Sequence, residues 1–200
     1  MKVVLADYGA GNLRSVCSAF ARVGAEPVVS ADPAAVLEAP LAVIAGVGHA
    51  VAAAEGLRAS GLDAAIRERV FAGRPVLGIC VGMQLLFEES EEGGSGLGLL
   101  RGPVRLLRAR RVPHMGWNSL ELRKESAVLA GLDGEDVYFA HSYAAVPDDP
   151  GVVAAVVDHE GEVVAAVERG ALAGVQFHPE RSGPHGARVL GNVLAWSRSA

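Results

Sequence analysis

The sequence predicts an α/β fold with a mostly parallel central sheet, flanking helices and an antiparallel extension. Two observations lead to this prediction. In the first half of the chain, short apolar runs alternate with segments of helical periodicity, the pattern of strands joined by helical crossovers. Such strands form a parallel sheet with helices on both faces. In the second half, apolar runs follow one another without helices between them, which favours antiparallel pairing.

The first half supplies the parallel strands and their helices. The predicted strands are residues 3–6, 27–30, 41–45 and 75–79, and the predicted helices are residues 12–23, a segment after Asp32, and residues 62–71. Asp32 is a favourable N-cap, and Pro33 suits the first position of the helix that follows. Cys17 recurs with its apolar neighbours at helical spacing, so we expect it on the core face of the first helix.

The second half supplies the antiparallel extension. Its predicted strands are residues 104–107, 117–122, 137–142, 152–157, 163–167 and 172–177, and residues 186–196 are predicted to form a closing helix. The polar segment 159–162 between two of these strands indicates a hairpin. No repeat, low-complexity tract or linker divides the 200 residues, so we expect one domain over residues 1–200.

The composition argues against several classes of protein. A formal net charge of −5 disfavours general binding to nucleic acids or membrane surfaces, and the arginine-rich segment 101–111 is better explained as a sheet edge or a partner surface. No apolar run approaches the roughly 18 residues that span a bilayer, and the N-terminus lacks the features of a signal peptide. We therefore expect a cytoplasmic location, which would keep a catalytic thiol reduced.

Neither a disulfide framework nor a metal site is expected. The chain has 2 cysteines and no Cys-x-x-Cys, and the histidines other than His178 show no metal-ligand spacing. Residues 7–12 contain Gly-x-Gly without the third glycine of a dinucleotide-binding loop, so a nucleotide site is not favoured.

The strongest candidate for chemistry is Cys80. It lies within residues 78–82, Gly-Ile-Cys-Val-Gly, where the predicted strand 75–79 ends and a helix begins. This is the layout of a nucleophile elbow, in which flanking glycines permit a sharp strand-to-helix turn. The N-terminus of a helix favours the thiolate form of a cysteine placed there. Unlike Cys17, Cys80 is therefore predicted to be a nucleophile.

A base and a carboxylate for this nucleophile are found within residues 176–180, Gln-Phe-His-Pro-Glu. Pro179 favours an extended His178, and in an extended segment His178 and Glu180 face the same side. Glu180 can then bind one ring nitrogen while the other faces the thiol. Alone, this segment would be explained as a surface turn. Together with the elbow it predicts a catalytic triad and points to hydrolysis or acyl transfer at a thiol.

Residues 46–48, Gly-Val-Gly, follow the predicted strand 41–45 and are candidates for an oxyanion hole. The backbone N–H groups of such a loop can approach a ligand closely. Because Gly-x-Gly after a strand is also common in ordinary turns, this segment is informative only in combination with the elbow and the His-Pro-Glu segment.

The chain resembles the class I, triad-type glutamine amidotransferases and, more narrowly, the glutaminase subunits of imidazole glycerol phosphate synthase. The elbow and the His-Pro-Glu segment are shared by the wider class. The narrower resemblance depends on residues 7–12 (Asp-Tyr-Gly-Ala-Gly-Asn), 113–118 (Pro-His-Met-Gly-Trp-Asn) and 138–143 (Tyr-Phe-Ala-His-Ser-Tyr). It extends from the first strand to the last helix. One departure is Ala45, where the family usually has a proline, which would fix φ.

The resemblance implies a reaction and the residues that carry it. Cys80 would attack the side-chain amide carbon of glutamine to form a glutamyl thioester, with His178 as the base and Glu180 orienting it. The implied oxyanion-hole residues are Val47, Gly48 and Val81, and the implied glutamine-binding residues are Gly46, Gly48, Gln84, Ser142 and Tyr143. The resemblance implies no cofactor and no metal.

The resemblance also implies a partner. Ammonia would pass to a cyclase subunit, a (β/α)8 barrel, which makes imidazole glycerol phosphate and aminoimidazole carboxamide ribonucleotide in histidine biosynthesis. The two subunits would form a heterodimer, with Trp117, Asn118, Tyr138 and Arg181 at the interface. Two alternatives remain: the glutaminase subunit of another synthase, such as pyridoxal phosphate synthase, and a non-catalytic interaction subunit on the same fold. Residues 113–118 argue against the first alternative, and the intact triad argues against the second.

Overall fold

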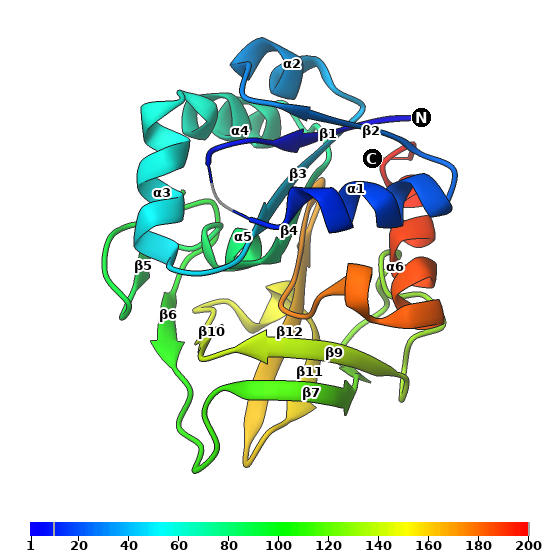
Figure 1. The fold of residues 1–200 in the computed structure, drawn as a ribbon. Coiled ribbons are helices and arrows are strands. Elements are labelled where there is room, and N and C mark those ends of the chain that lie inside the picture. The colour runs from blue at the N-terminus through cyan, green and yellow to red at the C-terminus, as the bar shows by residue number, and fades with distance from the viewer. Residues whose placement is uncertain (10, 200) are drawn as a thin grey trace.

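A central sheet of eight strands organises the molecule (Figure 1). The structure, a computed structural model, describes residues 1–9 and 11–199. Five strands are parallel, in the order β2 (Glu26–Ser30), β1 (Lys2–Ala6), β3 (Leu41–Gly46), β4 (Val76–Cys80) and β13 (Leu172–Val175). The sheet continues with antiparallel strands β12 (Glu162–Arg169), β11 (Val153–Asp158) and β8 (Glu121–Leu122). The mostly parallel sheet with an antiparallel extension is therefore confirmed.

Helices cover both faces of this sheet (Figure 1). On one side α1 (Leu13–Arg22) packs against α6 (Gly183–Trp196), and on the other α3 (Ala50–Ala59) packs against α4 (Leu62–Phe71). α2 (Pro33–Glu38) lies against α4. Strands β3 and β4 are consequently buried along their whole length, which explains why their sequences are continuous apolar runs.

Two smaller sheets lie below the parallel strands in the view of Figure 1. In one, β7 (His114–Ser119) pairs antiparallel with β9 (Asp136–His141). The other contains β5 (Glu89–Ser90), β6 (Pro103–Leu106) and β10 (Tyr143–Ala145). A short helix, α5 (Val81–Gln84), follows β4, and 3-10 turns cover Pro150–Val152 and Pro179–Arg181. Of these pieces, α5, β7, β9, β10 and the turn Pro179–Arg181 contribute residues to a pocket at the carboxyl end of β4, where Cys80 lies.

Local signals in the sequence correctly identified several boundaries. The Asp32 side chain accepts a hydrogen bond from the N–H of Ala34, with Pro33 at the first helical position of α2. The hairpin at residues 159–162 joins β11 to β12, with Glu160 at φ 56° and Gly161 at φ 137°. Cys17 packs half-buried against the core from α1.

Other boundaries differ from the prediction. The predicted strand 117–122 is wrong, because β7 ends at Ser119 and β8 begins at Glu121 in a different sheet. Leu120 between them is buried, and its N–H donates to the carbonyl of Glu135, so the chain changes direction there. Helix α3 was not predicted, because its alanine-rich segment lacks contrast between apolar and polar positions. The short strands β5 and β10 were also missed.

Candidate functional site

Cys80 occupies a tight turn between β4 and α5. Its backbone has φ 53° and ψ −111°, a region that residues other than glycine rarely adopt. The turn needs the glycines on either side of it. A Cβ at Gly82 would lie 1.8 Å from the carbonyl oxygen of Ile44, and a Cβ at Gly78 would lie 2.7 Å from that of Gly82. The segment therefore has the geometry expected of a nucleophile elbow.

His178 and Glu180 lie together, as their spacing predicted. Nδ1 of His178 is 2.9 Å from Oε1 of Glu180, and both side chains are almost fully buried. The backbone of His178 is fixed on both sides: its N–H donates to the carbonyl of Tyr138 on β9, and its carbonyl accepts from the Ser182 hydroxyl. Oε2 of Glu180 has no hydrogen-bond partner within residues 1–9 and 11–199. The imidazole is therefore held in one orientation.

The charge on His178 depends on Cys80 and Glu180. Burial disfavours its protonated form, but interactions with Cys80 and Glu180 outweigh burial and raise the pKa of His178 to about 10. An imidazolium is thus stable at neutral pH beside the sulfur. A cation beside a cysteine sulfur is an arrangement that nucleophilic chemistry at a thiol can use.

A pocket of about 310 Å³ opens above Cys80 and His178. Of the residues expected around the substrate, Val47, Gly48, Val81, Gln84, Ser142 and Tyr143 line it. Glu180 and Gly46 lie outside its described lining: Glu180 sits behind the His178 ring, and a Cβ at Gly46 would lie 2.6 Å from Oη of Tyr8. The structure thus brings together at one cavity the side chains that the sequence places in four separate segments.

Tyr8 holds the strand that leads into the Gly-Val-Gly loop. Its hydroxyl donates to the carbonyl of Ala45 at 2.8 Å, and burial raises the pKa of the phenol, with the nearby Cys80 adding to the shift. Beyond it, Gly48 has φ +90°, which is accessible to glycine. The Ala45 peptide is therefore restrained by a hydrogen bond from Tyr8.

Gln84 connects to a buried amide that the sequence analysis missed. Nε2 of Gln84 donates to the carbonyl of Tyr143 at 2.8 Å and to Oε1 of Gln176 at 3.1 Å. Nε2 of Gln176 lies 3.7 Å from Sγ of Cys80. The Gln84 amide nitrogen is thus engaged with the protein itself, and Gln176 is a polar neighbour of the thiol.

Five further residues line this pocket without having been predicted: Glu92, Pro113, Met115, Ala140 and His141. Glu92 is notable, because its Oε2 accepts from the N–H of Ala50 at 2.6 Å and its Oε1 lies 3.0 Å from Nδ1 of His49. It thereby binds the N-terminus of α3 and places a carboxylate at the pocket. Glu92 and its partners are more than 40 positions apart, so no local pattern could have identified it.

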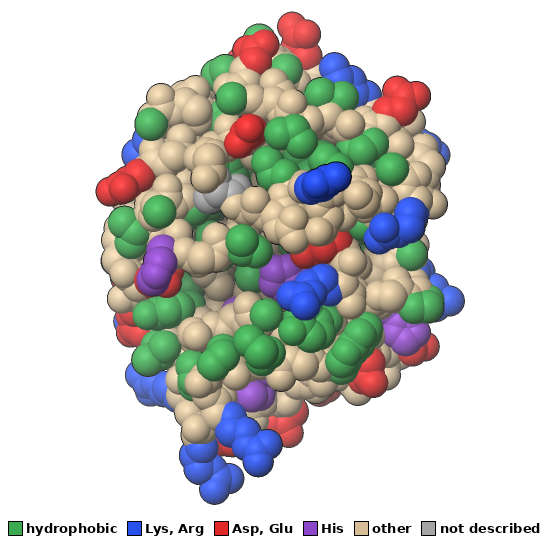
Figure 2. All heavy atoms as spheres, in the orientation of Figure 1, with side chains coloured by type: hydrophobic (Ala, Val, Ile, Leu, Met, Phe, Trp, Pro, Cys, Tyr) green, Lys and Arg blue, Asp and Glu red, His purple; other side chains and the backbone are tan. Residues whose placement is uncertain are grey.

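The residues expected at a partner interface form one cluster on the surface. The rings of Trp117 and Tyr138 meet edge to face with centroids 6.0 Å apart, and the Arg181 guanidinium lies over the Tyr138 ring at 4.6 Å. Trp117 is 56% exposed and Met115 on the same strand 65% exposed, so Trp117 is not a core residue. Figure 2 shows hydrophobic side chains gathered across this face over β7 and β9. We call these residues, Met115, Trp117, Tyr138 and Arg181, the β7–β9 face.

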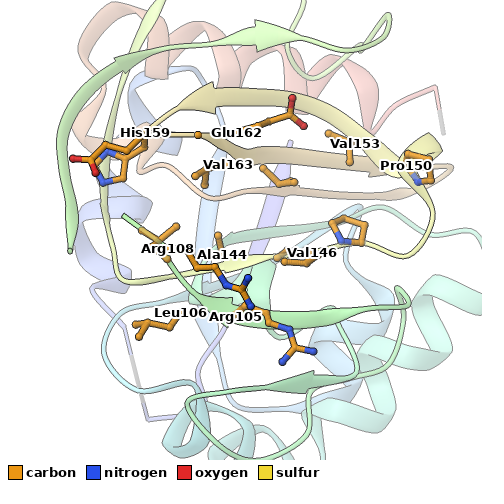
Figure 3. A pocket seen from close by; sticks show the side chains of 16 residues that line it. Arg105, Leu106, Arg108, Ala144, Val146, Pro150, Val153, His159, Glu162 and Val163 are labelled. Atoms are coloured by element: carbon orange, nitrogen blue, oxygen red, sulfur yellow. The ribbon is translucent and has the colours of Figure 1, made fainter. Parts of the chain in front are cut away.

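A larger cavity lies away from this chemistry. It has a volume of about 680 Å³ and opens between the β6–β10 ribbon and the β11–β12 hairpin (Figure 3). Arg105, Arg108, His159 and Glu162 surround an apolar floor that includes Ala144 and Val163 (Figure 3). The described lining includes neither Cys80 nor His178, so the smaller pocket is the candidate active site.

Residues 1–9 and 11–199 contain neither a metal-binding cluster nor a helix suited to crossing a membrane. No group of three or more His, Cys, Asp or Glu side chains in that part of the chain is arranged to hold a metal ion. None of the helices described has both the length and the apolar character that crossing a membrane requires.

Known proteins resemble this chain along almost all of its length. A family model described as glutamine amidotransferase class-I matches residues 4–195. The imidazole glycerol phosphate synthase subunit HisH of Mycolicibacterium paratuberculosis is 50% identical over 198 residues, which cover 96% of this chain and 96% of that protein. The subunit of the same name from Syntrophotalea carbinolica is 45% identical over 201 residues, covering 95% of this chain and 98% of that protein.

Solved structures share the fold at much lower identity. A crystal structure described as glutamine amidotransferase has a TM-score of 0.80 and 22% identity, with 98% of both chains covered. The structure of PurLQS from Thermotoga maritima has a TM-score of 0.74 and 22% identity, again with 98% of both chains covered. At these identities the likeness shows the fold.

Proposed function

We infer the function from one premise: the chain belongs to the class-I glutamine amidotransferases and, within them, to the HisH subunits of imidazole glycerol phosphate synthase. It is the glutaminase subunit of that synthase and acts in histidine biosynthesis. The observation that supports a specific mechanism is the convergence of Cys80 and the His178–Glu180 pair on one pocket.

The triad would act in two steps. Sγ of Cys80 attacks the side-chain amide carbon of glutamine, the C–N bond breaks, and His178 gives its proton to the leaving nitrogen, so that ammonia and a glutamyl thioester form. Water then adds to the thioester, His178 takes one of its protons, and the C–S bond breaks to release glutamate. Glu180, which accepts from Nδ1 of His178, keeps Nε2 available for both transfers.

Two elements of the pocket are suited to the charge that develops on the amide oxygen. Val81 follows the nucleophile at the start of α5, the position whose backbone N–H contributes to the oxyanion hole in elbow enzymes. Val47 and Gly48 line the same pocket and supply the second donor in our proposal. Such donors stabilise the tetrahedral intermediate more than the planar amide.

Glutamine recognition uses the remaining lining residues. Glu92 presents a carboxylate at the pocket, which is complementary to the α-ammonium group of the substrate. Residues 142–143, with Gln84 bonded to the carbonyl of Tyr143, form another wall. Gly46 acts indirectly by letting the loop pass close to Tyr8.

The partner in this proposal is a cyclase subunit, a (β/α)8 barrel, that forms a heterodimer with the glutaminase. It would dock on the β7–β9 face, with Asn118 beside it. Exposed Met115 lines the pocket and also belongs to that face, so the pocket opens toward the proposed interface. Ammonia could then pass directly to the cyclase for synthesis of imidazole glycerol phosphate and aminoimidazole carboxamide ribonucleotide. We further propose that residues 1–200 are one amidotransferase domain and that the protein is cytoplasmic, because Cys80 must stay reduced.

The test separates glutamine hydrolysis from the use of ammonia. In the reconstituted pair, Cys80→Ala should abolish glutamine-dependent synthesis and leave synthesis from added ammonium salt intact. His178→Ala should lose nearly as much, since members of a triad act as a unit. Cys17→Ala is the matched control and should retain both activities. Glutamine-dependent synthesis by Cys80→Ala would exclude this thiol as the nucleophile, and glutaminase activity without binding to the cyclase would favour another synthase.

A further inference from the structure

Three histidines that take no part in the proposed chemistry lie together beside the glutamine pocket. His114 on β7 pairs in register with His141 on β9, and Nδ1 of His114 is 3.0 Å from Nε2 of His141. His159, immediately after β11, stacks on the His114 ring with centroids 4.1 Å apart, and Phe139 also stacks on the His114 ring at 4.5 Å. His114 and His141 are buried. Two buried imidazoles in direct contact need a defined arrangement of protons.

The hydrogen-bond partners at both ends fix that arrangement. Nδ1 of His141 lies 2.9 Å from the carbonyl oxygen of Tyr143, which can only accept, so Nδ1 carries the proton and Nε2 is an acceptor. His114 must therefore donate from its own Nδ1 to that acceptor. This leaves Nε2 of His114 as an acceptor, and the Asn118 amide nitrogen lies 3.2 Å from it.

The orientation of the Asn118 amide agrees with this direction. Its Oδ1 accepts from the N–H of Ser119 at 2.9 Å, and its Nδ2 donates to the carbonyl of Asp158 at 2.9 Å. A flipped amide would place two acceptors against each other at Asp158. The protons thus all point one way, from Asn118 through His114 and His141 to Tyr143.

The chain of hydrogen bonds from Asn118 to Tyr143 requires both His114 and His141 to be neutral. Burial lowers the pKa of His114 to about 4, with nearby His159 adding to the shift. Burial likewise lowers the pKa of His141 to about 3, against the bond to Tyr143 and with the help of neighbouring histidines. Each ring therefore has one donor and one acceptor at neutral pH, as the chain requires.

The Tyr143 carbonyl links this chain to the nucleophile. It accepts from His141 and also from Nε2 of Gln84 at 2.8 Å. Gln84 in turn bonds to Gln176, whose amide nitrogen is 3.7 Å from the Cys80 sulfur. The backbone between His141 and Tyr143 includes the Ser142–Tyr143 wall of the pocket. The position of this backbone segment therefore depends on two donors to the Tyr143 carbonyl, one from His141 and one from Gln84.

We propose that His114 and His141 are positioning residues that hold the segment 141–143 in the conformation required to bind glutamine. The proposal rests on the proposed function, because the substrate of the pocket is glutamine in both. Neither histidine takes part in the proposed bond-making steps. Each acts through the Tyr143 carbonyl, and loss of the chain would mainly weaken substrate binding.

The experiment uses variants that separate hydrogen bonding from stacking. His114→Phe keeps an aromatic ring between Phe139 and His159 but removes both hydrogen bonds, whereas His114→Asn can retain the donor at the position of Nδ1. His159→Phe is the matched control. The His159 ring stacks on His114, but its Nε2 bonds to the Arg111 carbonyl, which is not part of the hydrogen-bond series from Asn118 to Tyr143. All three are assayed for glutaminase activity in complex with the cyclase subunit.

We expect His114→Phe to raise the KM for glutamine by about three- to tenfold, the effect of losing one or two buried hydrogen bonds, with a smaller change in kcat. His114→Asn should recover most of this loss, and His159→Phe should stay within about twofold of the unmodified protein. An unchanged KM in folded His114→Phe, or an equal rise in His159→Phe, would overturn the proposal. If His114→Phe does not fold, Asn118→Ala takes its place. The measurement is then the rate at which a thiol-reactive glutamine analogue labels Cys80 in the isolated glutaminase subunit. Labelling by iodoacetamide is the reference for general reactivity of the thiol. In Asn118→Ala, the ratio of the analogue's labelling rate to that of iodoacetamide should fall below the ratio in the unmodified protein. The same ratio in both proteins would overturn the proposal.

A spectroscopic readout is independent of activity. Ring-nitrogen NMR on the unmodified protein should find the proton on Nδ1 of both His114 and His141 at neutral pH. A proton on Nε2 of either neutral ring would contradict the proposed chain of hydrogen bonds even if the enzyme is active. Conversely, an inactive protein with both protons on Nδ1 would count against the proposed function, while the proposed chain of hydrogen bonds would still hold.

Discussion

Cys80 shows at the scale of one residue how backbone strain can serve a site. A non-glycine residue held in its conformation costs about 1–3 kcal/mol, so the surrounding structure must enforce it. Burial of the parallel strands and close packing of Gly82 on Ile44 provide that enforcement. The strained turn lets a thiol at the end of a buried strand reach the pocket surface.

Glu180 should control the charge of His178, and this can be tested by Glu180→Gln. Besides Cys80, the Glu180 carboxylate raises the pKa of His178, and the neutral amide removes that charge, so the pKa should fall below about 10. A group with a raised pKa stabilises the fold below its ordinary pKa of about 6.5 and loses this contribution as pH rises through the raised value. Glu180→Gln should therefore have a lower free energy of unfolding than the unmodified protein at neutral pH. Between neutral pH and pH 10, its free energy of unfolding should fall less than that of the unmodified protein. The variant should also lower kcat/KM by roughly 10²–10⁴, because the imidazolium beside the sulfur loses the carboxylate that stabilises it.

The measurement is an NMR titration of the His178 ring together with chemical denaturation at several pH values. Glu135→Gln is the matched control, since Glu135 pairs with the partly exposed His185 at 3.1 Å, away from the pocket. It should leave the titration of His178 unchanged. A His178 pKa that is the same in Glu180→Gln and in the unmodified protein would show that Glu180 does not set the charge of the base.

The residues of the site differ in how visible they are in the sequence. Cys80, His178 and Glu180 lie in short segments whose glycines and proline indicate the local backbone, so the sequence could predict that these residues lie close together. Gln176 bonds to Gln84, which is 92 positions away, and no local sequence pattern around either residue predicts this contact. His114 and His141 showed no metal spacing and were set aside, yet strand pairing brings them together. Such tertiary contacts could not be read from local sequence.

At the scale of elements, a buried arginine completes a helix that cannot cap itself. α2 has no basic residue in its last turn. Arg69, reaching from α4, is fully buried and donates to the carbonyls of Val36, Leu37 and Ala39 at 2.7–2.9 Å, and to that of Pro75 at 2.8 Å. Burial lowers the pKa of Arg69 to about 10, with Arg74 adding to the shift, yet the group stays charged at neutral pH. The bonds to Val36 and Ala39 supply donors to carbonyls at the C-terminal end of α2, where helix carbonyls lack partners within the helix.

Arg69→Met should therefore be strongly destabilising. It removes the Arg69 donor from the buried carbonyls of Val36 and Ala39, each at a cost of roughly 1–3 kcal/mol, so we expect the free energy of unfolding to fall by at least about 2 kcal/mol. Urea denaturation of both proteins measures this difference. Arg74→Met is the control, because Arg74 donates from an exposed position to Leu37, and it should cost less than about 1 kcal/mol. Equal losses in the two variants would contradict the capping role of Arg69.

The order of elements could be predicted further than their boundaries. Apolar runs identified β1, β3 and β4, because strands buried on both faces leave a continuous signal. The boundary between β7 and β8 could not be predicted, since Leu120 continues the strand pattern and only tertiary packing shows the change of sheet. In α3, a Cβ at Gly56 would lie 2.1 Å from the carbonyl oxygen of Tyr8, so close packing there requires glycine.

At the scale of the whole molecule, the arrangement of sheets joins the pocket to the β7–β9 face. β9 carries Tyr138, whose carbonyl accepts from the N–H of His178, and β7 presents Trp117 and Met115 outward. The same two-stranded sheet thus forms one wall of the active site and the proposed docking surface. A partner that covers this face would close the pocket from solvent, which suits transfer of ammonia between subunits.

Trp117→Ala tests this surface. An aromatic side chain at the centre of an interface often contributes 2 kcal/mol or more, so the Kd for the cyclase subunit should rise by roughly 30-fold or more. Since Trp117 is 56% exposed, the melting temperature should change little. Phe71→Ala is the matched control, because Phe71 is 85% exposed on α4, away from β7 (Figure 1), and should leave the Kd unchanged. Titration calorimetry gives both affinities. An unchanged Kd in folded Trp117→Ala, or an equal loss in Phe71→Ala, would show that the partner does not dock on the β7–β9 face.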